Sequence, residues 1–255
     1  NREVVYRYLY HRSVYWQSKT KASGFRIDAI RHMENDFLSR LSADLHKELG
    51  SSFWLLGEDF NGSPSALANR IEDTGINSLF DFPLYYAMTD SFCRDKSMHG
   101  LAATLWADRD YPSDYQPVRF LDNHDLPRIA SLCSEERFEE SLFFLFAVRG
   151  IPMLTYGTEF GLKGPEEPEN RASIDWDDHP KWKPLISDLS ALRSKHPILK
   201  KGTAQIVHME EDLNGEEIDR TESIPEGYVQ INTDLKGIQH DDSTVWPEGF
   251  SPEAI

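Results

Sequence analysis

Residues 24–33 read GFRIDAIRHM, and Arg26 and Asp28 stand two positions apart among apolar neighbours. Side chains alternate between the two faces of a strand, so residues two apart point the same way. The pattern therefore predicts a buried strand that aims a cation and a carboxylate into one space. Burying charges is costly unless they are paired, and such a pair can be structural or catalytic. The rest of the chain has to decide between these two interpretations.

Helical patterns flank this stretch on both sides. Residues 1–20 carry apolar side chains at helical spacing, and Asn1 is a suitable N-cap. In residues 35–50 leucines recur every three or four positions, Asn35 is a suitable N-cap and Gly50 a suitable end. The apolar face of the first helix is expected to consist of Val4, Val5, Tyr8, Leu9, Tyr15 and Trp16.

Short apolar runs then alternate with amphipathic helical patterns. Apolar strands separated by helices predict a parallel sheet with crossover helices, in which the carboxyl ends of the strands carry the chemistry. The strand from the opening stretch is followed by four more that end in polar or charged groups. The further strands are FWLLGE (53–58), SLFDFPL (78–84), VRFLDNHD (118–125) and IPMLTYGTE (151–159), and later helices are expected at 137–148 and 184–196.

The pattern changes near Gly202, which predicts two regions, 1–201 and 202–255. The first carries the strand–helix units. In the second, TAQIVHM (203–209) and GYVQINT (227–233) are typical of strands in a small antiparallel unit, joined by an acidic loop and followed by an irregular tail.

Composition and charge exclude several classes of function. The 255 residues include 43 acidic and 27 basic side chains, for a formal charge of -16. That balance opposes nucleic acid as a partner and fits a neutral or cationic ligand. No apolar run approaches the roughly 18 residues that would span a membrane, and the first residues do not resemble a signal peptide. Cys93 and Cys133 permit at most one disulfide and leave the cellular compartment open.

Three carboxylates are expected at strand ends: Asp28, Glu58 and Asp125. A single acid at such a place is often structural or merely solvated, but three on neighbouring strands would converge at one rim of the sheet. Retaining glycoside hydrolysis needs that arrangement, because one carboxylate attacks the sugar while a second, roughly 5–5.5 Å away, protonates the departing oxygen. A cation beside the attacker keeps it ionised, and an apolar setting keeps the acid protonated. Arg26 and the residues before Glu58 suit these two needs.

The motifs that carry these acids resemble those of the α-amylase family of glycoside hydrolases. The segments GFRIDAIRHM, GEDF, FLDNHD, RGIPMLTYGTE and NRASIDW occur in the family's order across roughly residues 1–200. The resemblance implies the last five strand–helix units of a (β/α)8 barrel, followed by a shortened β domain. It also implies a retaining hydrolase acting on starch or maltooligosaccharides.

The resemblance also implies roles by position. Asp28 matches the nucleophile, Glu58 the general acid and base, and Asp125 the acid that binds sugar hydroxyls and favours ring distortion. Arg26 would orient Asp28, and His124 would hydrogen-bond the sugar at the cleavage point. The remaining substrate-binding positions are Arg31 and His32 on the leaving-group side, and Glu167 and Arg171 on the other side.

Structural alternatives stand beside these roles. His32 could brace the following helix, Arg171 could bridge surface loops, and His124 with Asp125 could be a structural pair. Tyr115 and Trp176, in loop-like stretches, are candidate sugar platforms. The other aromatic residues are more often core than platform: Trp54, Tyr85, Tyr86, Trp106, Tyr111 and Tyr156.

The chain departs from the family pattern at its start. The family's first three strands and an early motif, which helps to bind calcium, have no counterpart, so a single calcium contact, the His32 carbonyl, could survive. No metal site is predicted from ligand spacing. The sequence is therefore expected to be a fragment with little activity alone. The alternatives are a transglycosylase or α-glucosidase of the same family, or a non-catalytic sugar-binding scaffold.

Overall fold

Five short parallel strands run through residues 2–202 and 204, the residues that the computed structural model describes. They are β1 (Gly24–Ile27), β2 (Trp54–Gly57), β3 (Ser78–Leu79), β4 (Val118–Phe120) and β5 (Ile151–Met153). β2 pairs with both β1 and β3, and β4 pairs with β5. A parallel bridge from Phe80 to Val118 joins the two sheets. The strands are parallel, as the alternation predicted, and they follow one another in chain order.

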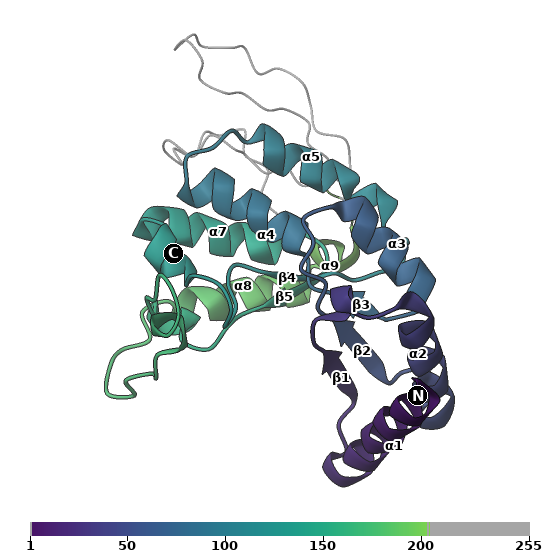
Figure 1. Ribbon diagram of the computed structural model, residues 1–255. Coiled ribbons are helices and arrows are strands. Elements are labelled where there is room, and N and C mark those ends of the chain that lie inside the picture. Colours follow the sequence, from purple (N-terminus) through teal and green to yellow (C-terminus); the bar gives the residue numbers. More distant parts are fainter. Residues whose placement is uncertain (1, 203, 205–255) are drawn as a thin grey trace.

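Helices connect the strands and pack around them (Figure 1). The α-helices are α1 (Arg2–Thr20), α2 (Asn35–Leu49), α3 (Pro64–Thr74), α4 (Phe82–Met88), α5 (His99–Ala107), α6 (Ile129–Leu132), α7 (Glu135–Ala147), α8 (Lys183–Lys195) and α9 (Ile198–Lys201). A π-helical segment, η2 (Thr89–Cys93), extends α4, and short 3₁₀ turns occur in the loops. Parallel strands linked by helices are consistent with the predicted partial barrel. The segments 203–209 and 227–233 lie outside the described residues, apart from residue 204.

Three predicted strands, now β3, β4 and β5, are shorter than the sequence suggested. β4 ends at Phe120, so Asp125 lies in the following loop and not at the strand end. β3 ends at Leu79, because Asp81 accepts a hydrogen bond from the backbone of Leu84 and so caps α4. β5 ends at Met153, and the chain then turns into a 3₁₀ helix that begins after Gly157, at φ 82°. Polar residues after each strand thus belong to loops, where chemistry is usually placed in this architecture.

The start of α2 differs from the prediction in a similar way. Glu34 is the N-cap, and Asn35 is the first helical residue. The side chain of Asn35 instead donates to Asp73 at 2.7 Å and accepts from Arg70, both on α3. Asn35 therefore joins two helices rather than capping one. Gly50 ends the helix at φ 98°, as expected.

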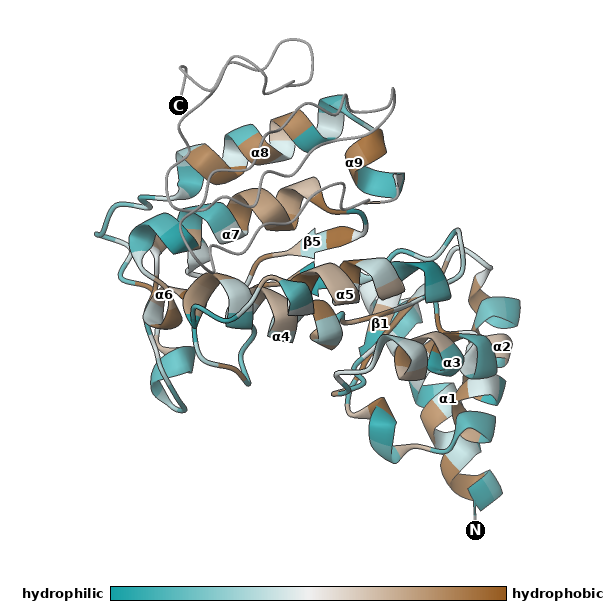
Figure 2. Cartoon of the chain, turned by 90° about the horizontal axis from the view of Figure 1, so that it is seen from above, coloured by the Kyte–Doolittle hydropathy of each residue, from teal (hydrophilic) through white to brown (hydrophobic). Residues whose placement is uncertain are grey.

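Apolar side chains gather in three clusters, one under α1–α3, one among α4, α5, α7 and α8, and a smaller one around Phe82 and Phe120. Figure 2 shows apolar and polar residues alternating along α7 and α8, which pack on the second cluster. A disulfide between Cys93 and Cys133 ties the end of η2 to the end of α6. None of the described helices is long and apolar enough to cross a bilayer.

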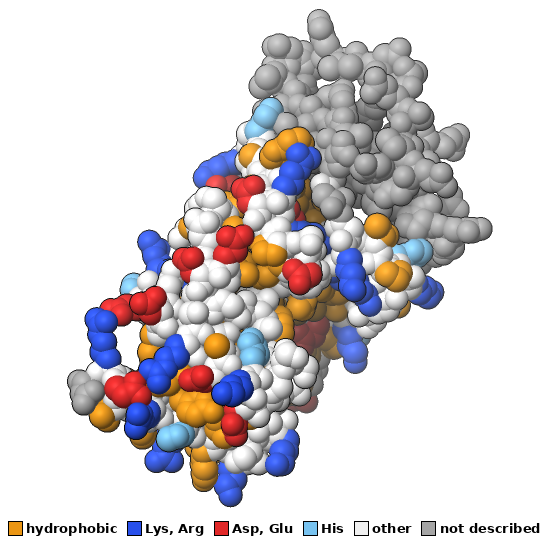
Figure 3. Space-filling view, turned by 90° about the vertical axis from the view of Figure 1, so that its right-hand side faces the viewer, with side chains coloured by type: hydrophobic (Ala, Val, Ile, Leu, Met, Phe, Trp, Pro, Cys, Tyr) orange, Lys and Arg blue, Asp and Glu red, His pale blue; other side chains and the backbone are white. Residues whose placement is uncertain are grey.

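The apolar face predicted for α1 is wrong. Tyr6 is the buried side chain of this helix, with Tyr10 and Val14 partly buried beside it. The helix is apolar on more than one side, so spacing alone could not identify the buried face. Figure 3 shows apolar side chains among basic ones at the lower end of the molecule, where α1 lies. The residues of the predicted apolar face do not pack on the core and are 41–60% exposed, namely Val4, Val5, Tyr8, Leu9, Tyr15 and Trp16.

Candidate active site

Two of the predicted acids follow directly on paired strands. Ile27, the last residue of β1, pairs with Gly57, the last residue of β2, so Asp28 and Glu58 directly follow the ends of two neighbouring strands. Gly57 has a steric reason to be glycine, because a Cβ there would lie 2.7 Å from both Ile30 and Leu79. Close packing around Gly57 therefore fixes the backbone immediately before Glu58.

One guanidinium joins these two acids. Arg26 Nη1 forms an ion pair with Asp28 Oδ1 at 2.7 Å, and Arg26 Nη2 forms one with Glu58 Oε1 at 2.5 Å. The pairing of Arg26 with Asp28 confirms what the two-residue spacing predicted. The contact with Glu58 was not predicted, since it depends on the register between two strands. Because a guanidinium is small and planar, two carboxylates that pair with its two terminal nitrogens are held close to each other.

The environments of the two carboxylates differ. The side chain of Glu58 is 8% exposed, whereas that of Asp28 is 71% exposed and that of Arg26 34% exposed. The expectation that Arg26 and Asp28 form a buried pair is therefore wrong, because the strand ends at Ile27 and Asp28 already lies in a turn. Ala29 has φ 48°, a left-handed conformation, and its backbone N–H donates to Glu58 Oε2 at 3.2 Å. The turn after β1 thus orients Glu58 as well as Asp28.

The third acid lies in a second group of polar side chains after β4. Asp125 Oδ2 is 3.2 Å from His124 Nε2, and Asp125 Oδ1 accepts from Arg171 Nη2 at 2.8 Å. Arg171 Nη2 is also 3.5 Å from Glu167 Oε1. The structure therefore brings four predicted site residues together. Among the described residues, no hydrogen bond or ion pair joins this group to the Arg26 group.

Two asparagines that the sequence analysis missed hold the Asp125 loop. Asn123 Oδ1 accepts from the backbone of Asp125 at 2.8 Å, and Asn170 Nδ2 donates to the carbonyls of His124 and Leu126 at 3.0 and 3.2 Å. The role of Asn123 could have been predicted from the sequence, because an asparagine side chain often accepts from the backbone N–H two residues later and so closes a turn. Asn170 had no local signal, since its partners lie about 45 positions away.

Buried Asp122 anchors the same loop to the strands and helices behind it. It accepts from the backbone of Ile129 at 2.9 Å, and its carbonyl accepts from the Thr155 hydroxyl at 2.8 Å. Burial raises the pKa of Asp122, although the nearby Arg128 cation acts in the opposite direction. Asp122 is therefore a structural acid, in contrast to Asp125, whose side chain is 36% exposed.

The two residues predicted on the leaving-group side lie in the turn after β1. Arg31 Nη1 donates to the carbonyl of Phe60 at 2.7 Å, which links this turn to the loop after Glu58. His32 is exposed and its backbone N–H donates to Ala29. Within the described residues, the His32 side chain has no hydrogen-bonding or ionic partner, so the structure gives no support to a bracing role.

The aromatic residues divide differently from the prediction. Tyr115 is not a platform: it is 5% exposed, its hydroxyl accepts from the backbone of Leu79, and burial raises its pKa. Trp176 is 79% exposed, as a platform requires. The core prediction is confirmed for Tyr85 and Tyr111, which are buried. It is wrong for three exposed residues: Tyr86, Trp106 and Tyr156.

The described residues alone do not assemble the carboxylate cluster of a calcium site. No group of three or more His, Cys, Asp or Glu side chains among them is arranged to hold a metal ion. Calcium requires six to eight oxygen ligands, which a lone carbonyl at His32 does not supply. No catalytic step is therefore assigned to a metal.

A sequence model described as "Alpha amylase, catalytic domain" matches residues 1–222. A cyclomaltodextrinase of Geobacillus thermopakistaniensis is 26% identical over 223 residues, which are 82% of this chain and 36% of that protein. A cyclomaltodextrin glucanotransferase of Bacillus licheniformis is 32% identical over 198 residues, covering 71% of this chain and 26% of that protein. The chain thus spans about a third or less of these relatives' length.

Solved structures resemble the fold as well. An alpha-amylase from Anoxybacillus superposes with a TM-score of 0.75 at 29% identity, covering 81% of this chain and 47% of that chain. An alpha-amylase from Geobacillus thermoleovorans, solved with acarbose, superposes with a TM-score of 0.72 at 29% identity, covering 77% of this chain and 46% of that chain.

Proposed function

Because the chain belongs to the alpha-amylase family, whose catalytic-domain model matches residues 1–222, we propose that it supplies the catalytic acids of a retaining α-glucan hydrolase. The substrate is starch or a maltooligosaccharide. The observation that carries this proposal is the bridge by Arg26, which holds Asp28 and Glu58 side by side at two strand ends. Two carboxylates at short separation are the requirement of a retaining mechanism.

In the proposed first step Asp28 attacks the anomeric carbon as Glu58 protonates the departing glycosidic oxygen. In the second step Glu58 takes a proton from water, and the water oxygen replaces Asp28 at the same carbon. Asp125 and His124 bind sugar hydroxyls around the bond. Arg31 and His32 contact the leaving-group side, and Arg171 and Glu167 lie on the other side.

Arg26 has the position of a residue that orients the two reacting acids. Its charge stabilises the ionised form of both acids. Asp28 must be a carboxylate to attack, whereas Glu58 has to take up a proton before it can act as the acid, so the expected apolar setting of Glu58 is replaced here by an ion pair. The turn at Ala29 holds Glu58 through a backbone N–H, so the acid has one fixed orientation. Such preorganisation places groups before the substrate binds and lowers the barrier of the reaction.

Transglycosylation is the second candidate. It is favoured by the 32% identity to a cyclomaltodextrin glucanotransferase, a protein whose name describes transfer. The same three acids serve both reactions, because only the acceptor in the second step differs. A non-catalytic scaffold is disfavoured, since such relatives usually lose these acids.

We expect the isolated chain to turn over starch slowly. The side chain of Asp28 is 71% exposed, so the described residues do not enclose the bond to be cleaved. Water therefore reaches the nucleophile, which weakens every electrostatic interaction in the site.

The test is a starch assay on residues 1–255, with NMR detection of the anomer that is released first. We expect slow release of the α-anomer, reduced about 10²–10⁴-fold by Glu58→Gln and at least as strongly by Asp28→Asn. The matched control is Asp36→Asn, an acid on the first turn of α2 outside the site. Release of the β-anomer, or full activity in Asp28→Asn, would refute the retaining assignment. A kcat within the usual 1–10³ s⁻¹ range would refute the expected weakness of the isolated chain.

A further inference from the structure

Asp59, the residue directly after the proposed acid Glu58, is a buried carboxylate. Its side chain is 1% exposed, and its Oδ2 accepts from Nε of Arg70, on α3, at 3.0 Å. The Arg70 side chain is 18% exposed. The catalytic steps proposed above give Asp59 no role, because a carboxylate so deeply buried does not reach a sugar.

The surroundings of Asp59 are not those that make a buried ion pair stabilising. Two buried charges offset the cost of leaving water only when their remaining hydrogen-bonding positions are also filled. Within the described residues, Oδ1 of Asp59 is buried and accepts no hydrogen bond. Two apolar side chains of similar size would fill the same space without this cost. Departures of this kind from the rules of burial are expected at functional sites, which favours a functional role for the pair.

Arg70 connects Asp59 to two helices. Arg70 belongs to α3, and its Nη1 donates to Oδ1 of Asn35, the first residue of α2. Asn35 in turn donates to Asp73 of α3 at 2.7 Å. Asp59 is therefore fastened to the start of α2 and to α3 at once.

Backbone hydrogen bonds hold Glu58 on its other side. The Glu58 N–H donates to the carbonyl of Ile27, and the Glu58 carbonyl accepts from the N–H of Ile30, each at 2.9 Å. Glu58 thus lies between the β1 turn, which holds its own backbone, and α3, which holds the next side chain along the chain. Supports of this kind restrict the direction in which a side chain leaves the backbone.

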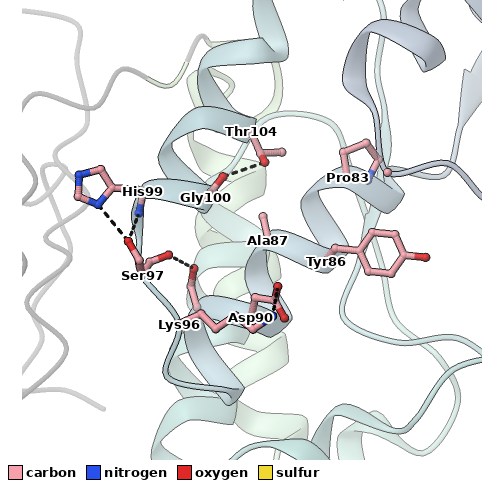
Figure 4. A pocket seen from close by; sticks show the side chains of 11 residues that line it. Pro83, Tyr86, Ala87, Asp90, Lys96, Ser97, His99, Gly100 and Thr104 are labelled. Carbon is pink, nitrogen blue, oxygen red and sulfur yellow. Dashed lines mark hydrogen bonds and ion pairs between the residues drawn. The ribbon is translucent and has the colours of Figure 1, made fainter.

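The loop that follows Glu58 borders open space further along. A hollow of about 650 Å³ lies between α4, η2 and α5, and Gly62 is part of its lining. Figure 4 shows Pro83 and Tyr86 at one end of this hollow. A hollow supports a loop less than close-packed side chains do. The contacts of Asp59 therefore contribute more to holding this loop in place.

We propose that Asp59, through its ion pair with Arg70, is a positioning residue that orients the Glu58 carboxyl for proton transfer to the departing sugar. This inference rests on the proposed function, because it takes Glu58 as the acid. Neither Asp59 nor Arg70 contacts the reacting atoms. A displacement of a catalytic group by about 1 Å lowers the rate by roughly 100-fold. Loss of the pair therefore slows the step in which the glycosidic oxygen is protonated.

The test compares two substrates that differ in their need for an acid. The departing sugar of maltopentaose must be protonated, whereas fluoride leaves α-maltosyl fluoride with little help from a proton. The quantity measured is kcat/KM, which reports the steps from free enzyme and substrate to the first transition state. A structural defect, or a displaced nucleophile, would lower kcat/KM for both substrates alike.

The main variant is Asp59→Leu combined with Arg70→Met, which removes the pair and leaves neither charge buried alone. It should keep the urea midpoint of the parent and lose about 10–100-fold in kcat/KM on maltopentaose, but less than about threefold on the fluoride. Asp59→Asn keeps the shape of the side chain and should show the same contrast between substrates. If the double variant does not fold, Asp59→Asn decides by the same comparison.

Glu58→Gln is the reference, and it should show the contrast between substrates most strongly. The matched control is Arg137→Met with Glu140→Leu, a half-buried ion pair on α7 at 3.1 Å, which should change neither kcat/KM. Equal losses on both substrates in the Asp59 variants, or no loss on either, would overturn the inference while the contrast in Glu58→Gln still supported the proposed function. A Glu58→Gln protein without the contrast, or a parent that cleaves neither substrate, would overturn both.

Discussion

Arg26 is the residue on which the chemistry of the site depends most. It contacts Asp28 and Glu58 with separate nitrogens of one guanidinium, at 2.7 and 2.5 Å. A lysine has a single ammonium and cannot reproduce this planar fork. Loss of the fork therefore disturbs the relative placement of both acids without removing either of them.

We predict that Arg26→Ala lowers kcat about 100-fold and changes KM little, because the reacting groups are misplaced rather than lost. Guanidinium ion at millimolar concentration should restore part of kcat, and Arg26→Lys should remain impaired. The control is Arg12→Ala, on the exposed side of α1. A normally folded Arg26→Ala protein that keeps its kcat would contradict a positioning role. A reduced kcat that does not respond to guanidinium would contradict it as well.

For single residues, the sequence predicted an ionic partner better than it predicted solvent exposure. The spacing of Arg26 and Asp28 predicted their ion pair correctly, because two residues so close in sequence stay within reach of each other although Asp28 lies in the turn after β1. It did not predict the contact with Glu58 or the exposure of Asp28, which depend on strand register and on where β1 ends. Tyr115 was misassigned for a similar reason: it is buried in the cluster under α1–α3, where its hydroxyl accepts from the backbone of Leu79, 36 positions away.

Among the structural elements, β4 is held to its neighbours by a buried charge network. Arg119 is 1% exposed and pairs with Asp81 before α4 at 3.1 Å and with Asp108 after α5 at 2.5 Å. Arg149, before β5, pairs with the same Asp108 at 3.1 Å. The network ties β4 to the residue before α4, to the end of α5 and to the residues before β5.

Arg119→Met should lower the free energy of unfolding by about 3–5 kcal/mol at pH 7, because it leaves buried acids without a partner. Burial already raises the pKa of Asp81 above its ordinary 3.8, although Arg119 acts in the opposite direction. An acid whose folded pKa is raised destabilises the fold increasingly as pH rises above its unfolded value. Urea unfolding should therefore show a smaller defect at pH 4 than at pH 7.

The matched control for this prediction is Arg109→Met, an exposed arginine stacked on Trp106, which should change stability by less than about 0.5 kcal/mol. An Arg119→Met protein as stable as the parent, or one whose defect is larger at pH 4, would show that the network is not a stabilising unit.

The disulfide between Cys93 and Cys133 is a second link between elements. It closes a separation of 40 residues, for which the chain-entropy model gives about 4 kcal/mol of stabilisation. We predict that dithiothreitol lowers the Tm of the parent and leaves a Cys93→Ala, Cys133→Ala double variant unchanged. Two thiols that react with iodoacetamide in unreduced, denatured protein would contradict this assignment.

Element positions followed from sequence more readily than their packing. Hydrophobic runs predicted all five described strands, and the leucine repeat predicted α2. The lengths of β3 and β5 and the orientation of α1 could not be predicted, because capping contacts and tertiary packing decide them. Asn35 illustrates this limit: its side chain bonds to α3 and leaves the capping position to Glu34.

At the scale of the whole molecule, the main feature is that the first and last described strands, β1 and β5, each have one edge without a paired strand. Within the described residues β1 pairs only with β2, and β5 only with β4. Edges of this kind and the exposed apolar side chains of α1 are surfaces on which proteins usually pack further polypeptide. The same openness explains why Asp28 is exposed and why slow turnover is expected from these residues alone.

The measurement that tests the account most directly is covalent trapping of the nucleophile with a maltosyl epoxide of α configuration, followed by peptide mass spectrometry. The account predicts one glucan adduct, on Asp28 within residues 24–33, absent in Asp28→Asn and formed more slowly in Glu58→Gln. An adduct on Asp125 or another carboxylate, or equal labelling of Asp28→Asn, would contradict the assignment of the two acids bridged by Arg26.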